Sequence, residues 1–281
     1  MCGLKTLSRL KKVKFEFSLR EFSKNIQILQ SLEDCLELRC LNLKVLLWSE
    51  KDIGRITRFL ETKKETLEVL KLQLLSPDVF RGSDEMNELV KTIDNFPQLT
   101  SLYLSAKSRK PSKDKDYILE GVAYNFSNLL SKAVKMKKFR ISLGQPWIWK
   151  EEFFAFVWLL TGISETLEKL EVDVGEYKPD NESDMNAILE FTSSLKDIRS
   201  LKLTSISTQH KDFMWQMIEA IARLKFLRSL GFGDISGEIM KQLLKEGVEK
   251  ILCKYGLWKF KCTTSLIYEL PIDLISTGPI C

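Results

Sequence analysis

One pattern recurs along this chain and limits the folds that it can adopt. Residues 64–74 read KETLEVLKLQL, and residues 164–174 read SETLEKLEVDV. Both segments place apolar residues at the same spacing, so that a leucine is followed by apolar residues three and five positions later. Self-similarity at a fixed period is the signature of a repeat architecture, in which each repeat is one structural unit.

The same spacing can be followed through most of the chain. The middle apolar residue of each copy, which we call the anchor, lies 28 to 37 residues after the previous anchor. The anchors are Val13, Leu41, Leu70, Leu102, Phe139, Leu170, Leu201, Leu230 and Phe260. Residues around each anchor alternate with a period of two, which is typical of a strand.

Helical patterns follow several of these predicted strands. Ser83 precedes a stripe at Met86, Leu89, Val90 and Ile93, with the spacing of one helix face and a capping residue in front. Similar stripes follow Ser183 (Met185, Ile188, Leu189, Thr192) and Asp212 (Met214, Met217, Ile218, Ile221). The unit is therefore a strand, a loop, a helix and a return, and stacked units share one core.

This pattern resembles the leucine-rich repeat, in its long-repeat, ribonuclease-inhibitor-like class. The resemblance covers about Leu4 to Thr263. It implies an α/β solenoid, or horseshoe, of about nine repeats with a parallel concave sheet and convex helices. We expect residues 1–263 to form the repeat domain and residues 264–281 a tail or cap. An ordinary α/β fold with alternating strands and helices is the alternative.

The chain departs from the family five residues after each anchor, where Asn or Cys is usual and bonds the backbone within a turn. These positions instead hold Ser18, Leu46, Leu75, Lys107, Gly144, Gly175, Ile206, Ile235 and Ser265.

Composition and motifs point away from membrane, metal and catalytic functions. The longest apolar run, residues 153–160, is far shorter than the roughly 20 residues of a membrane span. One histidine, His210, and six cysteines without a CxxC pair predict no metal and no cofactor. No phosphate-binding loop or GxSxG motif is present. The acidic pair Glu151 and Glu152 is interpreted as structural, because negative charge is favourable at the start of a helix. We therefore predict no catalytic residue. Reduced cysteines favour a cytoplasmic protein, with a nuclear location as an option.

The concave sheet face is predicted to be basic. If the anchors point into the core, the residues on either side of them, and those two positions further on, line the inner face. Ten of these 27 residues are basic and three are acidic. Strands about 4.8 Å apart concentrate this charge, which favours an acidic protein partner. The predicted partner-binding residues are Lys12, Lys14, Lys44, Lys71, Tyr103, Lys138, Arg140, Lys169, Lys202, Lys259 and Lys261.

Two alternatives concern this face. Its lysines can simply keep an exposed sheet soluble. Nucleic acid is an unlikely partner, because Tyr103 is the one aromatic residue on which a base could stack.

Two segments stand out from the repeats. Residues 106–117, AKSRKPSKDKDY, are predicted to form a mobile loop whose basic cluster could serve as a nuclear-import signal. Residues 146–160, PWIWKEEFFAFVWLL, predict a helix that is apolar on nearly all sides, which indicates a second interface. An unusually wide buried face is the alternative. The residues of this second interface are Trp147, Trp149, Phe154 and Trp158.

The resulting hypothesis is a non-enzymatic protein-interaction scaffold that binds an acidic macromolecular surface on a rigid curved sheet. The resemblance also allows a substrate-recognition subunit of a ubiquitin ligase, although no adaptor-binding motif precedes the first repeat. It further allows a GTPase-activating protein, for which Arg140 is the one inner-face arginine. A structural subunit of a large assembly is the third alternative. The oligomeric state and the identity of the partner stay open.

Overall fold

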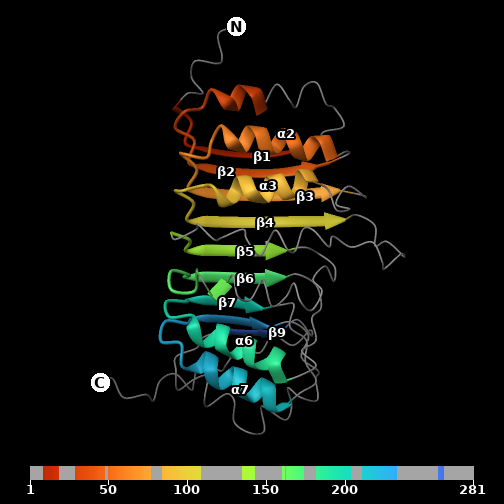
Figure 1. The fold of residues 1–281 in the computed structure, drawn as a ribbon. Coiled ribbons are helices and arrows are strands. Elements are labelled where there is room, and N and C mark those ends of the chain that lie inside the picture. The colour runs from red at the N-terminus through yellow and green to blue at the C-terminus, as the bar shows by residue number, and fades with distance from the viewer. Residues whose placement is uncertain are drawn as a thin grey trace.

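The fold was analysed in a computed structural model. The structure describes residues 9–18, 29–47, 50–76, 84–108, 135–142, 160–161, 163–173, 182–203, 211–232 and 259–262. These residues contain nine strands in a single parallel sheet, whose strand order follows the chain order (Figure 1). The strands are β1 (Lys12–Ser18), β2 (Cys40–Leu46), β3 (Val69–Ser76), β4 (Ser101–Ser108), β5 (Lys138–Ser142), β6 (Lys169–Asp173), β7 (Ser200–Leu203), β8 (Ser229–Phe232) and β9 (Lys259–Cys262).

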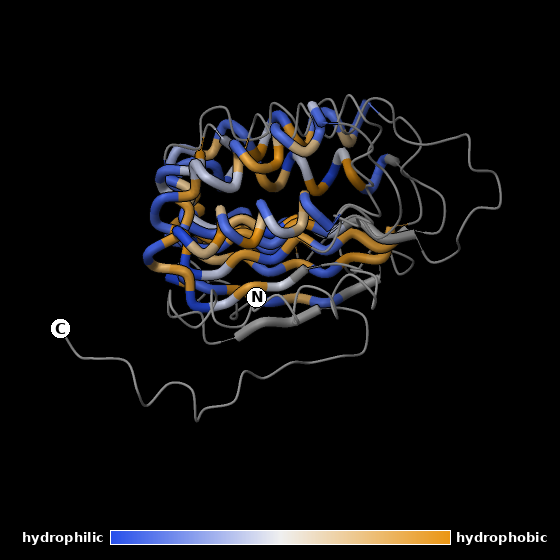
Figure 2. Tube along the Cα trace, turned by 90° about the horizontal axis from the view of Figure 1, so that it is seen from below, coloured by the Kyte–Doolittle hydropathy of each residue, from blue (hydrophilic) through white to orange (hydrophobic). Residues whose placement is uncertain are grey.

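The described helices lie on one side of this sheet. Figure 2 shows them as one layer, with the stacked strands as the other. Each helix follows the strand of the same number, as a crossover between parallel strands requires. The helices are α2 (Glu50–Glu61), α3 (Asp84–Asp94), α6 (Glu182–Ser194) and α7 (Lys211–Ala222). A one-directional sheet in chain order with helices on one face is a leucine-rich-repeat solenoid of the α/β class, as predicted.

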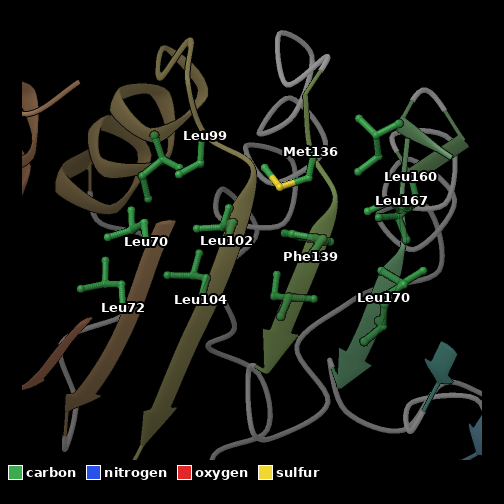
Figure 3. Packing of buried hydrophobic residues seen from close by; sticks show 14 of the residues in the cluster. Leu70, Leu72, Leu99, Leu102, Leu104, Met136, Phe139, Leu160, Leu167 and Leu170 are labelled. Carbon is green, nitrogen blue, oxygen red and sulfur yellow. The ribbon is translucent and has the colours of Figure 1, made fainter. Parts of the chain in front are cut away.

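The predicted anchors form one column across the sheet. Every strand pairs with the next in the register that places anchor beside anchor, from Val13 to Phe260. Figure 3 shows Leu70, Leu102, Phe139 and Leu170 at equivalent places on four neighbouring strands. All four are fully or almost fully buried, so each repeat completes the core of its neighbour.

The helical stripes are confirmed, with small differences at the helix starts. In α3 the predicted Met86, Leu89, Val90 and Ile93 are buried. In α7 the four predicted residues are buried as well. α3 begins at Asp84, directly after the predicted cap Ser83, but the caps predicted at Ser183 and Asp212 are wrong, because α6 begins at Glu182 and α7 at Lys211. Ser183 and Asp212 therefore lie in the first helical turn, where a polar side chain can still reach free backbone N–H groups.

The stripe of α6 is rotated slightly from the prediction. Ile188 and Thr192 are buried as expected, but Met185 and Leu189 are only half-buried. Phe191 and Asp184, which the pattern did not include, are buried instead. The sequence identified the helix but not the detailed direction of its inner face.

The missing asparagine ladder has a structural cause in β2 and β3. These strands do not turn five residues after the anchor but continue in extended form. Val45 and Leu74, four residues after their anchors, are fully buried, while Leu46 and Leu75 are half-buried on the opposite face. Because the chain is still a strand at this point, it has no inward turn for an asparagine side chain to bond.

Several predictions fall outside the described residues. They concern the tail at residues 264–281, the residues of the second interface, His210, and the pair Glu151–Glu152. The prediction of a loop at residues 106–117 is wrong for residues 106–108, because β4 continues through Ser108. The rest of that segment is likewise outside the described residues.

Candidate functional site: the open face of the sheet

The side of the sheet opposite the described helices is called the open face, and it carries the predicted site. The strand register aligns its residues in three columns: the positions before the anchors, after the anchors, and three residues after the anchors. All the predicted partner-binding residues lie in these columns. Lys259 and Lys261 are placed by the backbone of β9, which pairs with Ser229 and Gly231. The structure thus places these residues on one face, with those of consecutive repeats on neighbouring strands from β1 to β9.

The described side chains of this face have a basic excess. Eight of them are basic and three are acidic. Of the basic residues, Lys12, Lys14, Lys138, Arg140 and Lys169 are exposed, and Lys44, Lys71 and Lys202 are half-exposed. The basic set is Lys12, Lys14, Lys44, Lys71, Lys138, Arg140, Lys169 and Lys202, and the acidic set is Glu16, Glu171 and Asp173.

Tyr103 is held between two cations. The Nζ atom of Lys71, on β3, lies 4.9 Å from the centroid of the Tyr103 ring. The guanidinium carbon of Arg140, on β5, lies 4.5 Å from the same centroid. Gln73 also donates a hydrogen bond of 3.1 Å to the tyrosine hydroxyl. Cations therefore approach the ring of Tyr103 from both neighbouring strands, where they would compete with a stacking base.

Glu171 links two of the predicted basic residues. Its carboxylate accepts from Arg140 Nε at 3.1 Å and from Lys202 Nζ at 2.9 Å. The glutamate side chain is only 9% exposed, whereas its two partners are about half-exposed. Gly231 leaves room for Lys202, since a Cβ atom there would lie 3.1 Å from Lys202 Cγ. Sequence analysis treated Arg140 and Lys202 as free charges, and the structure shows that both are paired within the sheet.

Lys44, Arg140 and Lys202 are ion-paired and Lys71 lies over the Tyr103 ring, which leaves four exposed lysines of the described open face without a described partner. Lys44 is paired with Glu16, and Asp173 accepts a hydrogen bond of 2.9 Å from Ser142. Lys12, Lys14, Lys138 and Lys169 form no ion pair with any carboxylate that the structure describes. These four exposed lysines lie at two places, on β1 and across β5 and β6, while Lys71 lies between them on β3.

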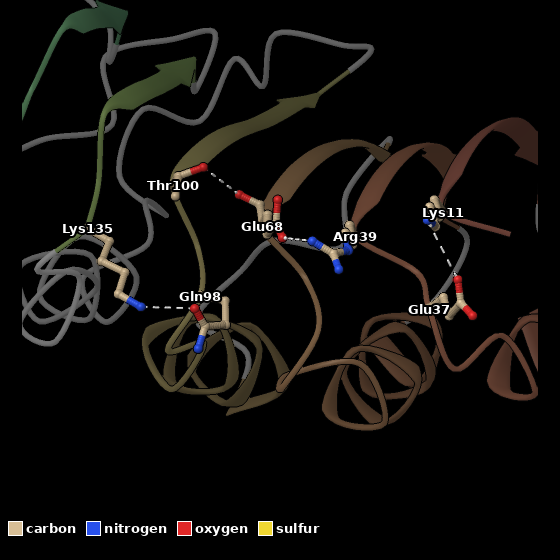
Figure 4. Close-up of polar contacts among 7 residues, drawn as sticks. All are labelled: Lys11, Glu37, Arg39, Glu68, Gln98, Thr100 and Lys135. Atoms are coloured by element: carbon tan, nitrogen blue, oxygen red, sulfur yellow. Dashed lines mark hydrogen bonds and ion pairs between the residues drawn. The ribbon is translucent and has the colours of Figure 1, made fainter. Parts of the chain in front are cut away.

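A polar ladder at the flank of the sheet was missed by the sequence analysis. Figure 4 shows it at the point where each chain segment enters its strand. Arg39 pairs with Glu68 at 2.8 Å, and Thr100 donates to the backbone carbonyl of Glu68 at 3.1 Å. The residues two positions before the anchors also bond to one another through the backbone: the N–H group in one repeat donates to the carbonyl oxygen of the equivalent residue in the preceding repeat, as Arg39 does to Lys11. These contacts fasten neighbouring repeats together.

The far end of this flank carries a basic cluster that sequence analysis also missed. Phe226 is 49% exposed, and four exposed basic residues accompany it. None of the four is paired with a described carboxylate. The run RLKFLR at residues 223–228 was the available signal. The basic residues of this flank cluster are Arg199, Arg223, Lys225 and Arg228.

The described part of the chain offers no evident site for a metal. It contains no group of three His, Cys, Asp or Glu side chains that could hold an ion. Cys35 is buried, Cys40 is half-buried and both are free thiols. Burial raises the pKa of the Cys35 thiol, which makes it a poor nucleophile.

A cavity of about 420 Å³ lies on the helix side, between the first turns of α6 and α7. Glu182, Lys211 and Asp212 are among its lining residues. No helix among the described residues is long and apolar enough to cross a membrane.

Comparisons with known proteins add little beyond this geometry. No protein-family model and no curated protein matches the chain. Among solved structures, it is similar to a leucine-rich-repeat protein of Leptospira interrogans, with 13% identity and a TM-score of 0.34 over 78% of this chain and 66% of the other. It is also similar to an internalin of Listeria monocytogenes, with 12% identity and a TM-score of 0.28 over 83% of both chains. Because these TM-scores are low, the fold assignment rests on the sheet order and the anchor column.

Proposed function

We propose that this chain is a non-enzymatic interaction scaffold of the ribonuclease-inhibitor-like repeat class, which binds an acidic protein surface on its open face. The observation that carries the proposal is the group of four exposed lysines without a described partner, on a face with eight basic and three acidic side chains. A cytoplasmic or nuclear location belongs to the same proposal, and the free thiols of Cys35 and Cys40 support it.

The physical basis is a preformed charged surface. The backbone of the face is fixed by the parallel ladder, and Tyr103 and Glu171 hold several of its side chains in place. Binding to such a surface orders few additional groups, so that little conformational entropy is lost. Clustered charge of one sign also speeds association with an oppositely charged partner and makes binding sensitive to salt.

The structure gives no comparable support to the other functions. An arginine finger must reach toward a bound nucleotide, but the guanidinium of Arg140 is engaged with Glu171 and Tyr103. No described feature favours a ubiquitin-ligase subunit or a subunit of a large assembly. We therefore advance no second candidate.

The proposal can be tested with a fluorescein-labelled oligoglutamate peptide and fluorescence anisotropy at low ionic strength. Three open-face charges are removed in Lys12→Gln/Lys14→Gln/Lys71→Gln. Because each charge contributes roughly a factor of two to three to binding at close range, we expect affinity to fall about tenfold.

The matched control removes three charges from the flank cluster, in Arg223→Gln/Lys225→Gln/Arg228→Gln. This variant should lose less affinity than the open-face variant, because its charges lie beside the open face and therefore further from the bound peptide. Melting curves confirm that both variants are folded. A larger loss of affinity in the flank variant than in the open-face variant would contradict the proposal.

A further inference from the structure

The strand positions directly before the anchors hold hydrogen-bond donors on five consecutive strands. In register from β4 to β8 this row consists of Ser101, Lys138, Lys169, Ser200 and Ser229. The two lysines are exposed and the three serines are half-buried. The row thus presents ammonium and hydroxyl groups and contains no carboxylate, and we call it the donor row.

The carboxylates nearest to the donor row are already engaged. Glu171 lies two residues after Lys169 on the same strand face, and Arg140 and Lys202 hold it. Asp173 accepts from Ser142. Lys138 and Lys169 are direct neighbours in the sheet, about 4.8 Å apart at the backbone. Two like charges therefore lie side by side, without a described counter-charge.

We propose that the donor row binds a phosphorylated serine or threonine side chain of the acidic protein partner. The inference rests on the proposed function and names the group that the partner presents at β5 and β6. A phosphomonoester carries a charge of about −1.5 to −2 at neutral pH and three strong acceptor oxygens. It can neutralise both lysines at once and still accept from a neighbouring serine hydroxyl, whereas a carboxylate carries a single negative charge.

The observations favour a phosphorylated protein over a nucleic acid. A nucleic acid presents a run of phosphodiesters, each with one charge, and binds best along a continuous basic groove with aromatic platforms. On this face Glu16, Glu171 and Asp173 interrupt the basic residues, and cations from both neighbouring strands lie over the ring of Tyr103. The donor row fits one dianion rather than a chain of monoanions.

The test uses short labelled Glu–Gly peptides that differ only at the central residue, which is phosphoserine, glutamate or serine. With the wild type, we expect the phosphoserine peptide to bind at least about tenfold more tightly than the glutamate peptide, because charge-assisted hydrogen bonds are the strong ones. This preference should shrink below about pH 6, where the phosphate gains a proton. Equal affinity for the phosphoserine and glutamate peptides would overturn the inference.

Three variants locate the effect. Lys138→Gln/Lys169→Gln should remove the preference for phosphoserine, and Ser200→Ala should reduce it by about two- to fivefold, as expected for one hydrogen bond to a charged group. The matched control, Lys12→Gln/Lys14→Gln, removes the same charge from β1 and should weaken all three peptides while keeping the preference. Loss of the preference in the control, or its retention in Lys138→Gln/Lys169→Gln, would overturn the inference.

A single-stranded RNA of similar length serves as the competitor. If it displaces the phosphoserine peptide from the wild type but not from Lys138→Gln/Lys169→Gln, the donor row binds nucleic acid and the inference is wrong. If oligoglutamate binds Lys12→Gln/Lys14→Gln/Lys71→Gln as tightly as the wild type, the proposed function is contradicted instead. The two ideas can therefore fail separately.

Discussion

Replacing Glu171 by Gln should change stability and anion binding in opposite directions. Its carboxylate is nearly buried between Arg140 and Lys202, and both ion pairs are short. The cations remain about half-exposed, so they can regain water when the carboxylate is lost. Exposed pairs contribute roughly 0.2–1 kcal/mol each, so the loss of two pairs should lower the free energy of unfolding by about 0.4–2 kcal/mol. For a chain of this size, in which 1 kcal/mol shifts the melting midpoint by about 2 °C, that corresponds to a midpoint lower by about 1–4 °C.

The same substitution adds one positive charge to the open face. Glu171 and Lys169 are two residues apart on one strand, hence about 7 Å apart at the backbone. Removing a negative charge at that distance from a bound anion is worth about 0.6 kcal/mol in water, which is a two- to threefold gain in affinity. At physiological salt the gain should fall to about 1.5-fold, because the screening length is then about 8 Å.

Calorimetry and anisotropy with oligoglutamate measure the two effects of this substitution on the same sample. Unchanged melting would show that Arg140 and Lys202 do not stabilise the sheet through Glu171. Weaker binding of oligoglutamate at low salt would show that the anion does not lie near β6, which would refute the reasoning about the open face.

Two further predictions concern the core and the returns between repeats. Leu70→Ala should lower the free energy of unfolding by about 2–5 kcal/mol, because this anchor is fully buried. The control Leu36→Ala changes a side chain that is 73% exposed, so its stability should stay within about 0.5 kcal/mol of the wild type. Equal denaturant midpoints for the two variants would disprove the anchor column. Lys63→Met should cost about 1–3 kcal/mol at neutral pH, because the Lys63 ammonium group, in a residue that is 2% exposed, bonds the backbone carbonyls of Glu33 at 2.6 Å and Cys35 at 3.1 Å. Burial lowers the pKa of Lys63, so the folded protein loses this proton at a lower pH than the unfolded chain does. Between the folded pKa and the unfolded value of about 10.4, the stability of the wild type should therefore rise relative to that of Lys63→Met. If the difference between their denaturant midpoints narrows as the pH rises through this range, the reasoning is contradicted.

The core of the solenoid was predictable because it depends on single residues. Leu41, Leu70 and Leu170 are buried for their own hydrophobicity, and their spacing alone sets the register that aligns them. The helical stripe of α3 was predictable for the same reason. The orientation of α6 was not, because apolar residues lie on more than one side of this helix, and packing against neighbouring elements buries Phe191 and leaves Met185 half-buried.

The pairing of charges was less accessible to sequence analysis. Arg140 and Glu171 are 31 residues apart, and their contact exists only because β5 and β6 are neighbours in one register. The anchor spacing already contained this register, so the pair could have been read from it. The approach of Lys71 and Arg140 to Tyr103 could not, because it depends on the side-chain conformations of three residues on three strands.

Pairing changes the view of how a partner can engage the open face. A count of lysines suggests a uniform basic strip, but the exposed lysines without a described partner are Lys12 and Lys14 on β1 and Lys138 and Lys169 on β5 and β6. These two places are four to five strands apart, which corresponds to about 19–24 Å along the sheet. An acidic helix would need about 13–16 residues to reach both, and an extended segment about six or seven. A partner with acidic groups at that separation can use both pairs, whereas a compact acidic patch can use only one.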